Sequence, residues 1–472
     1  MSEDKTPLCV DLDGTLIKTD VMFESIVILL KYNPLNLFLI IFWLIKGRYY
    51  LKEKLIEKTK LDPNKIPINE EIIEYLKIER KNGRKIFLVT AAMQEIANLY
   101  SDYFGFFDEA IGSKDGINLV GKNKASYLVR RFGEGGFDYI GDSKKDLYIW
   151  KYSRNSYIVN QTKNLIDKVK KHSNVLKTWN LIPEHKIILF FKQIRAYQWV
   201  KNLLIFLPVV LSHSLNLKDY FLSFLAFVSF SFLSSSIYLI NDIYDLDSDR
   251  NHPEKKYRPF ASGYLNLLFV LKAFIILFLL SFVIALFVTP KFLLSIFIYL
   301  IFSLLYTYSF KKIPILDIVI LSFLFTIRIY AGSFATNIAI SEWLFSFSIF
   351  FFLSLSSLKR YIELIKMNDN SKLIGRAYNK EDSNLIKIIG VSTGLISILV
   401  YVLYINSSKV NSLYSNPEYL YFILLILIYW LLRLWFYSDK KTINYDPISF
   451  ILKDKVSYIL LLFSIILFIF AL

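Results

Sequence analysis

Two patterns of hydrophobic and polar residues divide this chain. In the first, short apolar runs such as Lys85–Val89 and Phe137–Ile140 alternate with charged stretches of helical pattern. This alternation predicts a soluble α/β domain over residues 1–186. From Gln198 onward the apolar runs lengthen to the roughly 20 residues that a helix needs to cross a bilayer, so residues 187–472 are expected to form a membrane domain.

The second part contains nine such runs, which predicts an all-α domain of nine transmembrane helices. Their cores lie at about 197–213, 219–240, 264–288, 291–310, 315–336, 342–358, 385–405, 418–436 and 456–472. The loops after even-numbered runs carry 17 Lys and Arg residues, whereas the loops after odd-numbered runs carry three. Because Lys and Arg are enriched in cytoplasmic loops, this asymmetry predicts a multi-pass protein of the inner (cytoplasmic) membrane with its N-terminal domain in the cytoplasm.

One apolar stretch, Val21–Ile45, fits neither pattern. Lys31, Asn33 and Pro34 interrupt it, and a residue before proline is disfavoured in a helix. The stretch therefore predicts two helices joined by a turn, which form either a helical cap on the α/β domain or a hairpin on the membrane surface. A membrane-spanning segment is the less favoured alternative because of the break.

The composition of the chain limits the kinds of partner and metal site that can be expected. The chain has 56 Lys and Arg against 40 Asp and Glu, a formal charge of +16, but the basic residues lie mostly in short segments between apolar runs. Membrane topology explains that placement, so no nucleic-acid partner is expected. The single cysteine, Cys9, excludes a disulfide framework and a cysteine-based zinc site. No signal peptide is expected, since Asp11 and Asp13 interrupt the first apolar stretch.

The motif Asp11-Leu-Asp13-Gly-Thr15 follows that first apolar strand. Open α/β sheets bind their ligands at the carboxyl ends of strands, where both carboxylates would lie. One carboxylate can attack phosphorus while the other handles the proton of the leaving group, with Mg²⁺ offsetting the charge. Alone, the pentapeptide is also typical of an ordinary turn.

Three further pieces strengthen the phosphatase interpretation. Thr90 ends the strand Lys85–Val89, Lys124 lies in a Gly-Lys-Asn-Lys-Ala segment, and Asp142 follows another predicted strand. A hydroxyl and an ammonium group can hold phosphate oxygens, and a later aspartate can complete the oxygen shell of a metal.

In this order the set resembles the haloacid-dehalogenase (HAD) family of phosphatases over roughly residues 6–160. The resemblance implies a Rossmannoid fold, a nucleophile at Asp11, a general acid/base at Asp13, and Mg²⁺ held by Asp11, Asp13 and Asp142 with support from Asp146. It also implies phosphate contacts from Thr90 and from a lysine, which is Lys122 or, preferably, Lys124. The alternative is a HAD fold kept only as a scaffold.

The second span ends in an aspartate-rich segment, Asn241-Asp242-Ile-Tyr-Asp245-Leu-Asp247-Ser-Asp249-Arg250. Spacings of three and four place Asp242, Asp245 and Asp249 on one face of a helix, where they would repel one another unless cations lay between them. Hard oxygen ligands suit Mg²⁺ carrying a diphosphate. A solvated helix end is the alternative, but it would not need the acids on a single face.

The cations Lys255, Lys256 and Arg258 follow in an Arg-Pro segment, as a metal-bound diphosphate requires on its other side. Together the aspartate-rich and basic segments resemble the UbiA superfamily of nine-helix membrane transferases. Several segments are most similar to decaprenyl-phosphate phosphoribosyltransferases. That resemblance implies these substrate-binding residues: Lys201, Asn202, Asn241, Lys255, Lys256, Arg258, Arg328, Lys359, Arg360 and Glu363.

One departure from the family pattern is informative. Members that consume prenyl diphosphates usually carry a second Asp-x-x-x-Asp after the sixth span, whereas this chain has Lys359 and Glu363 at that spacing. Replacing an acid by a cation favours an additional anion nearby. Arg328, in the middle of a span, is not expected to face lipid, so a buried phosphate contact or an ion pair must account for it.

The resemblance implies Mg²⁺-dependent transfer of 5-phosphoribosyl from phosphoribosyl diphosphate (PRPP) to a polyprenyl phosphate in the bilayer, with Asp242, Asp245 and Asp249 holding the metal. The HAD-like domain is then expected to remove the 5-phosphate from the lipid product; an unrelated soluble phosphate is the alternative substrate. Two other functions stay open. One is a UbiA prenyltransferase that moves an isoprenoid from its diphosphate to an aromatic or glycerol acceptor, and the other is a membrane-anchored phosphatase whose helical part only binds lipid.

Overall fold

The computed structural model describes residues 6–182, 184–367, 376–443 and 447–472. The chain forms two compact units. The first combines Met1–Ala196 with Tyr238–Phe274, and the second combines Tyr197–Ile237 with Ile275–Leu472. The first unit therefore contains the aspartate-rich segment together with the α/β domain.

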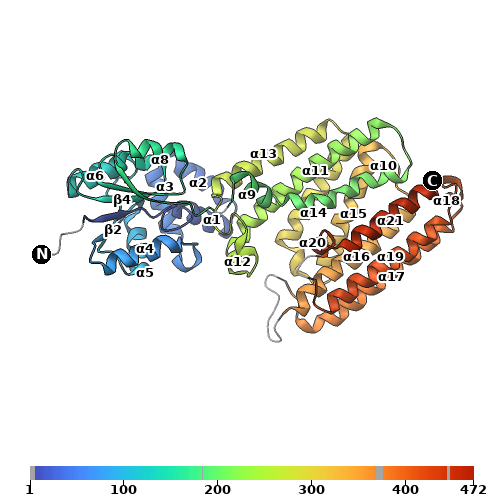
Figure 1. The fold of residues 1–472 in the computed structure, drawn as a ribbon. Helices are drawn as coiled ribbons and strands as arrows, with labels where there is room; N and C mark the ends of the chain where they lie inside the picture. The colour runs from blue at the N-terminus through green and yellow to red at the C-terminus, as the bar shows by residue number, and fades with distance from the viewer. Residues whose placement is uncertain (1–5, 183, 368–375, 444–446) are drawn as a thin grey trace. The chain divides into compact units, whose positions relative to one another are not determined.

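The α/β domain is built on a six-stranded parallel sheet with the strand order β3-β2-β1-β4-β5-β6 (Figure 1). The strands are β1 (Leu8–Val10), β2 (Ile86–Met93), β3 (Glu109–Ser113), β4 (Asp138–Gly141), β5 (Asn155–Val159) and β6 (Asn174–Trp179). This confirms the predicted α/β fold. The predicted end of β2 at Val89 is wrong, because the strand continues through a register shift and pairs again with β3 at Met93, so Thr90 lies inside it.

Both faces of the sheet are buried, as is usual for parallel sheets. Successive side chains of a strand point to opposite faces, so Leu8 and Val10 pack in one hydrophobic core with Leu76, whereas Cys9 packs in the other with Leu128. The helices that contribute to these faces are α4 (Glu70–Lys81), α5 (Gln94–Phe104), α6 (Lys122–Phe132), α7 (Leu147–Trp150) and α8 (Lys163–Lys170). Strand β1 is therefore buried between two layers of helices, one on each face of the sheet.

Three helices are inserted between β1 and β2. They are α1 (Val21–Tyr32), α2 (Asn36–Ile45) and α3 (Arg48–Lys58). The side chain of Asp20 caps α1 by accepting a hydrogen bond from the Met22 N–H at 2.9 Å, and the chain leaves the helix at Asn33, before Pro34. The break expected from the sequence therefore falls between α1 and α2.

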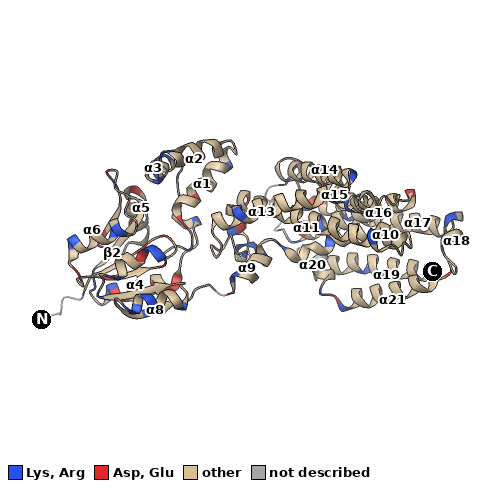
Figure 2. Cartoon of the chain, turned by 90° about the horizontal axis from the view of Figure 1, so that it is seen from above, with Lys and Arg blue, Asp and Glu red and all other residues tan. Residues whose placement is uncertain are grey.

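The remaining elements are mostly long apolar helices. They are α9 (Lys186–Gln193), η3 (Ala196–Phe206), α10 (Leu207–Leu211), α11 (Leu217–Tyr244), α12 (Leu246–Asn251), α13 (Leu267–Leu286), α14 (Pro290–Tyr308), α15 (Leu316–Thr336), α16 (Glu342–Ile365), α17 (Ser383–Ile405), α18 (Ser408–Leu413), α19 (Tyr419–Asp439), α20 (Pro447–Ile451) and α21 (Lys455–Ala471). Short 3₁₀ turns lie at Pro63–Lys65, Lys144–Asp146, Lys255–Tyr257, Phe310–Lys312 and Lys380–Asp382. Charged residues are dense on the α/β domain and sparse along the long helices (Figure 2).

Within the described residues, six helices are long and apolar enough to cross a membrane: α11, α13, α14, α15, α17 and α19. The pair formed by α9 and the helical segment Ala196–Leu211, bent by 51°, would be a seventh span. Helices α16 and α21 occupy the other two predicted runs without meeting the same criteria. The chain is thus a multi-pass membrane protein, and the count of nine spans stays a prediction.

Candidate active sites

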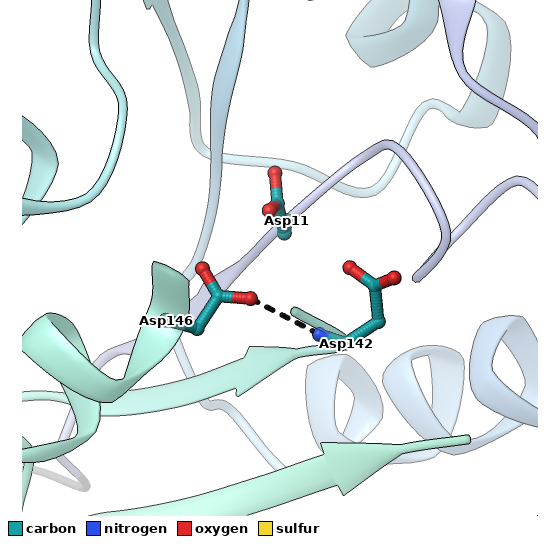
Figure 3. Close-up of side chains that lie close together, drawn as sticks. All are labelled: Asp11, Asp142 and Asp146. Atoms are coloured by element: carbon teal, nitrogen blue, oxygen red, sulfur yellow. Dashed lines mark hydrogen bonds between the residues drawn. The ribbon is translucent and has the colours of Figure 1, made fainter. Parts of the chain in front are cut away.

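Asp11 and Asp142 lie at the centre of the parallel sheet, where ligands are expected. Asp11 follows β1 and Asp142 follows β4, and these two strands are neighbours at the point where the strand order reverses direction. Ligand oxygens of Asp11, Asp142 and Asp146 all lie within 4.8 Å of one another (Figure 3). Gly14 belongs to this arrangement, because a Cβ at its positive φ of 73° would collide with the Asp142 carboxylate.

Lys124, and not Lys122, is the lysine that reaches the candidate nucleophile. Its Nζ lies 2.9 Å from Asp11 Oδ1, and its side chain is only 2% exposed. The same Nζ donates to the Tyr139 hydroxyl at 3.1 Å, which in turn donates to Asp146 Oδ1 at 3.2 Å. Lys122, two residues earlier on α6, is exposed. One buried ammonium group therefore contacts Asp11 directly and Asp146 through the Tyr139 hydroxyl.

Thr90 and Asp13 complete the set predicted for the phosphatase. Thr90 is fully buried, and its Oγ1 accepts a hydrogen bond from the Ala92 N–H at 3.0 Å, which leaves its own hydroxyl hydrogen for a phosphate oxygen. Asp13 Oδ1 accepts from the Val21 N–H at 2.8 Å, at the start of α1. Asp13 thus sits where the sheet domain meets the inserted helices.

The carboxylates of this site carry more negative charge than Lys124 can neutralise. Burial raises the pKa of Asp13 and of Asp142 well above the usual range, and the charges of Asp20 and Asp146, respectively, raise them further. Burial and then the charge of Asp11 raise the pKa of Asp146 to about 6. A divalent cation would relieve this repulsion, and the oxygen donors are those that Mg²⁺ prefers. The residues present therefore fit Mg²⁺.

A cavity of about 150 Å³ opens beside Asp13, between the inserted helices α1 and α3 and the sheet domain. Its polar lining includes Asp13, Asp20, Arg48, Lys52, Asn118 and Lys145. Lys52 Nζ donates to the Ala91 carbonyl at 2.5 Å and to Asn118 Oδ1 at 3.1 Å. Sequence reasoning missed Arg48 and Lys52, although their spacing of four on one helix was a usable signal.

The aspartate-rich segment keeps helical spacing although α11 ends at Tyr244. The Asp245 N–H donates to the Asn241 carbonyl and the Asp249 N–H donates to the Asp245 carbonyl, each at 2.8 Å. Asp242 and Asp249 are buried, whereas Asp245 is half-buried. Asn241 Oδ1 is buried with no hydrogen-bond partner among the residues that the structure describes. Helical hydrogen bonding of the backbone thus continues across the helix break.

Arginines bridge the buried aspartates. Arg258 Nη1 lies 3.1 Å from Asp242 Oδ1 and also pairs with Asp249. Asp242 further accepts from Arg195 and, at 2.8 Å, from Gln193 Nε2. The structure therefore brings Arg258 to the predicted acids, but it does not gather Asp242, Asp245 and Asp249 into one ligand group over the described ranges. Their metal-binding role stays a prediction.

The nearby lysines differ in position. Lys255 Nζ lies 3.9 Å from Asp249 Oδ1, whereas Lys256 Nζ lies over the ring of Tyr257 at 5.1 Å. Lys255 is therefore the better placed of the two for an anion held at the aspartate-rich segment.

In the second unit, Arg328 is buried within α15 and has neutral partners. Its Nε donates to Asn202 Oδ1 at 2.8 Å and its Nη2 donates to the Tyr299 hydroxyl at 3.1 Å. It also lies over the rings of Phe230 and Phe325. No carboxylate pairs with it in the part of the chain that the structure describes, and its role as a phosphate contact stays a prediction.

Lys201 and Arg360 are two other residues of this unit that the sequence predicted to bind substrate. Lys201, next to Asn202 in the chain, donates to Gln198 Oε1 at 3.0 Å. Arg360 is fully buried in α16, where it pairs with Glu363 and donates from Nε to Asp317 Oδ2 at 2.9 Å. Sequence reasoning missed Asp317, an acid in the first turn of a span.

The half-buried Lys359 precedes Arg360 on the same helix. The negative charge of Glu363 is therefore already paired with an arginine, which leaves Lys359 as an additional cation of this segment.

Comparison with known proteins explains the helical part. Residues 203–469, more than half of the chain, match the UbiA prenyltransferase family. The chain belongs to this family. It is 34% identical to an uncharacterised protein, y4nM, of Sinorhizobium fredii over 96% of this chain and 89% of the relative. It is also 29% identical to the decaprenyl-phosphate phosphoribosyltransferase of Mycobacterium tuberculosis over 45% of this chain and 72% of that enzyme.

Solved structures resemble each part of this UbiA-family chain. A UbiA homologue from Archaeoglobus fulgidus bound to GPP and Mg²⁺ is 17% identical and covers 60% of this chain and 96% of its own, with a TM-score of 0.44. A phospho-aspartyl intermediate analogue of phosphoserine phosphatase is 16% identical and covers 38% of this chain and 94% of its own, with a TM-score of 0.26. The UbiA-family chain thus carries a parallel-sheet α/β domain ahead of its helical part.

Proposed function

We propose that the membrane domain transfers the 5-phosphoribosyl group of PRPP to a polyprenyl phosphate, and that the HAD-like domain hydrolyses the 5-phosphate of the lipid product. The observation that carries the first step is the aspartate-rich segment, in which Arg258 bridges Asp242 and Asp249. Alternating acids and cations suit a magnesium diphosphate. The similarity to decaprenyl-phosphate phosphoribosyltransferases supports PRPP as the donor.

In the transfer step, an oxygen of the lipid phosphate attacks C1 of the ribose, and the bond between C1 and the diphosphate oxygen breaks. Mg²⁺ held by Asp242, Asp245 and Asp249 would supply charge stabilisation to the departing diphosphate. Arg258 and Lys255 hold the other oxygens of that group, and Arg258 exchanges its contacts with Asp242 and Asp249 for contacts with the diphosphate. Five residues of one segment thus bind the leaving group.

The second unit supports two phosphate substrates over a prenyl diphosphate. Arg328 carries a buried positive charge with neutral partners, so a phosphate is the counter-ion that it lacks. In the segment where prenyl-diphosphate enzymes place a second acidic pair, Glu363 is paired with Arg360 and Lys359 adds a cation. Both features favour an acceptor that is itself a phosphate.

In the hydrolysis step, Asp11 attacks the phosphorus of the ribose 5-phosphate, and the bond from phosphorus to the sugar oxygen breaks. Lys124 and Thr90 hold the phosphate oxygens. Asp13, whose pKa is raised well above the usual range by burial, is suited to give its proton to the departing sugar oxygen. Water, deprotonated by Asp13, then releases phosphate from Asp11.

The test follows radiolabelled PRPP into lipid with purified protein, Mg²⁺ and polyprenyl phosphate. We expect wild type to accumulate ribosyl lipid without its 5-phosphate, Asp11→Asn to stop at the phosphoribosyl lipid, and Asp245→Asn to form neither. Because a metal ligand is lost without loss of packing, the Asp245→Asn rate should fall at least about 10² to 10³-fold. Label transfer only from a prenyl diphosphate would instead assign the chain to prenyl transfer. Identical lipids from wild type and Asp11→Asn would refute the coupled hydrolysis.

A further inference from the structure

Helix α2 exposes an apolar surface that the phosphatase fold does not need. It has ten residues, none of them charged, and only Ile40 and Trp43 are buried. The exposed side chains include Phe38 at 70% and Ile45 at 79%, and the others are Leu37, Leu39, Ile41, Phe42 and Leu44. A contiguous apolar patch of this kind marks a binding surface for a partner or a membrane.

Helix α1, which leads into α2, is held by the loop between two membrane-spanning helices. Arg250 Nη2 and Nη1 donate to the two carboxylate oxygens of Glu24 at 2.7 and 2.9 Å, and both side chains are only 9% exposed. Lys31 Nζ, in the last turn of α1, lies 2.8 Å from Asp247 Oδ2. Asp247 and Arg250 follow the end of α11 at Tyr244 and precede α13. These pairs place the start of α2 near the membrane surface.

The length and flanks of α2 fit insertion into one leaflet. Ten residues at about 1.5 Å each span about half of a hydrocarbon core of about 30 Å, so α2 cannot cross the bilayer. Lys46 follows its end and lies over the ring of Phe42 at 4.6 Å, and Arg48 comes two residues later. An apolar helix with basic flanks is the pattern of segments that lie in the interface of an anionic bilayer.

Helices α1 and α3, which flank α2 in the chain, line the cavity of the phosphatase site. Arg48, three residues after Ile45, lines the cavity together with Asp13. Its side chain is exposed and has no carboxylate partner among the residues that the structure describes. The cavity, about 150 Å³, is smaller than the roughly 300 to 1,000 Å³ of pockets that enclose whole ligands. It has room for a phosphorylated headgroup, whereas a polyprenyl chain must lie outside it.

We propose that α2 inserts into the bilayer and that the Asp11 site takes the phosphate monoester of a membrane lipid, with Arg48 binding a second anionic group of the headgroup. The phosphodiester that would join ribose to the isoprenoid supplies that anion. The identity of this lipid rests on the function proposed above, whereas the insertion of α2 does not. In this arrangement the monoester faces Asp11, and the second anion faces Arg48 at the membrane side of the cavity.

Insertion is tested with the full chain in vesicles of phosphatidylcholine and phosphatidylglycerol. A bimane fluorophore is attached to the cysteine of the Phe38→Cys variant. Lipids that carry a nitroxide on the acyl chain quench its fluorescence if the fluorophore lies inside the bilayer. Ile78→Cys on α4, at an exposed position of 57%, is the matched control. Cys9 can stay, because burial raises the pKa of its thiol and keeps it unreactive. We expect strong quenching at position 38 and none at 78; equal quenching at both positions, or none at 38, would overturn the insertion.

The lipid substrate is tested with synthetic 5-phosphoribosyl polyprenyl phosphate and with ribose 5-phosphate. Phe38→Asp should lower kcat/KM for the lipid about tenfold or more and leave ribose 5-phosphate hydrolysis within about twofold, because Phe38 does not line the cavity. Ile78→Asp should change neither. Wild type that cleaves ribose 5-phosphate but not the lipid would overturn the inference, whichever donor the membrane domain uses. Because the lipid is supplied ready-made, failure of the transferase reaction leaves this result unaffected.

Discussion

Replacing Lys124 by methionine removes the buried cation of the phosphatase site and so tests its role. Lys124 Nζ lies 2.9 Å from Asp11 Oδ1, and the side chain is 2% exposed, so water cannot take its place. The substitution would leave three carboxylates, those of Asp11, Asp142 and Asp146, with ligand oxygens within 4.8 Å and no ammonium group between them. The nucleophile would also face a phosphate without the positive charge that holds it.

The expected loss follows from these contacts. Removing one partner of a buried ion pair costs about 3 to 5 kcal/mol of stability, and loss of one donor to the reacting group lowers kcat about 10² to 10³-fold. Mg²⁺ should restore part of the stability of Lys124→Met, because it offsets the same carboxylates. It should not restore the rate, because the lysine contacts the phosphate itself.

Lys122→Met is the matched control, since it removes the same charge two residues away on the same helix. Lys122 is exposed and lies over the ring of Tyr148 at 5.5 Å. Its loss should change kcat by no more than about twofold, as is usual for surface substitutions. The assay is hydrolysis of p-nitrophenyl phosphate by full-length protein in detergent with saturating Mg²⁺. Equal losses in the two variants, or a Lys124→Met rate within about threefold of wild type, would refute the role of the buried lysine.

Three further predictions concern other parts of the chain. Arg328→Met should lower the rate of phosphoribosyl transfer at least about 10²-fold, because it removes a buried phosphate contact. Tyr299→Phe, which removes one partner of that arginine, should lower the rate less than about tenfold. Similar losses of rate in the two variants would show that Arg328 only supports packing. Burial raises the pKa of Asp146 to about 6 and the pKa of Asp142 well above the usual range, so protons compete with Mg²⁺ for these carboxylates. The Mg²⁺ affinity of the phosphatase should therefore rise with pH through about 6; a pH-independent affinity by calorimetry would contradict this. Single cysteines at Ser262 and Ser412 should react with an impermeant reagent only from the cytoplasm and only from outside, respectively; the reverse pattern would overturn the predicted topology.

Local sequence determined the parts of this protein that depend on neighbours along the chain. An apolar strand followed by Asp11 and Asp13 places both carboxylates at a strand end, because the strand fixes where the loop begins. Helical periodicity predicts Asp242, Asp245 and Asp249 on one face, and the backbone hydrogen bonds from Asp245 to Asn241 and from Asp249 to Asp245 continue the helical spacing across a break in the helix. Long apolar runs likewise predict membrane helices, since bilayer thickness sets their length.

The tertiary structure decided which side chains meet. Lys122 and Lys124 are about 200° apart around one helix, and only the packing of α6 against the sheet selects the one that faces Asp11. Arg360 pairs with Asp317 across 43 residues, and Arg250 pairs with Glu24 across 226. Such contacts follow from the path of the chain in space. Periodicity reports which residues share a face of one element, but it holds no information about which other element will cover that face.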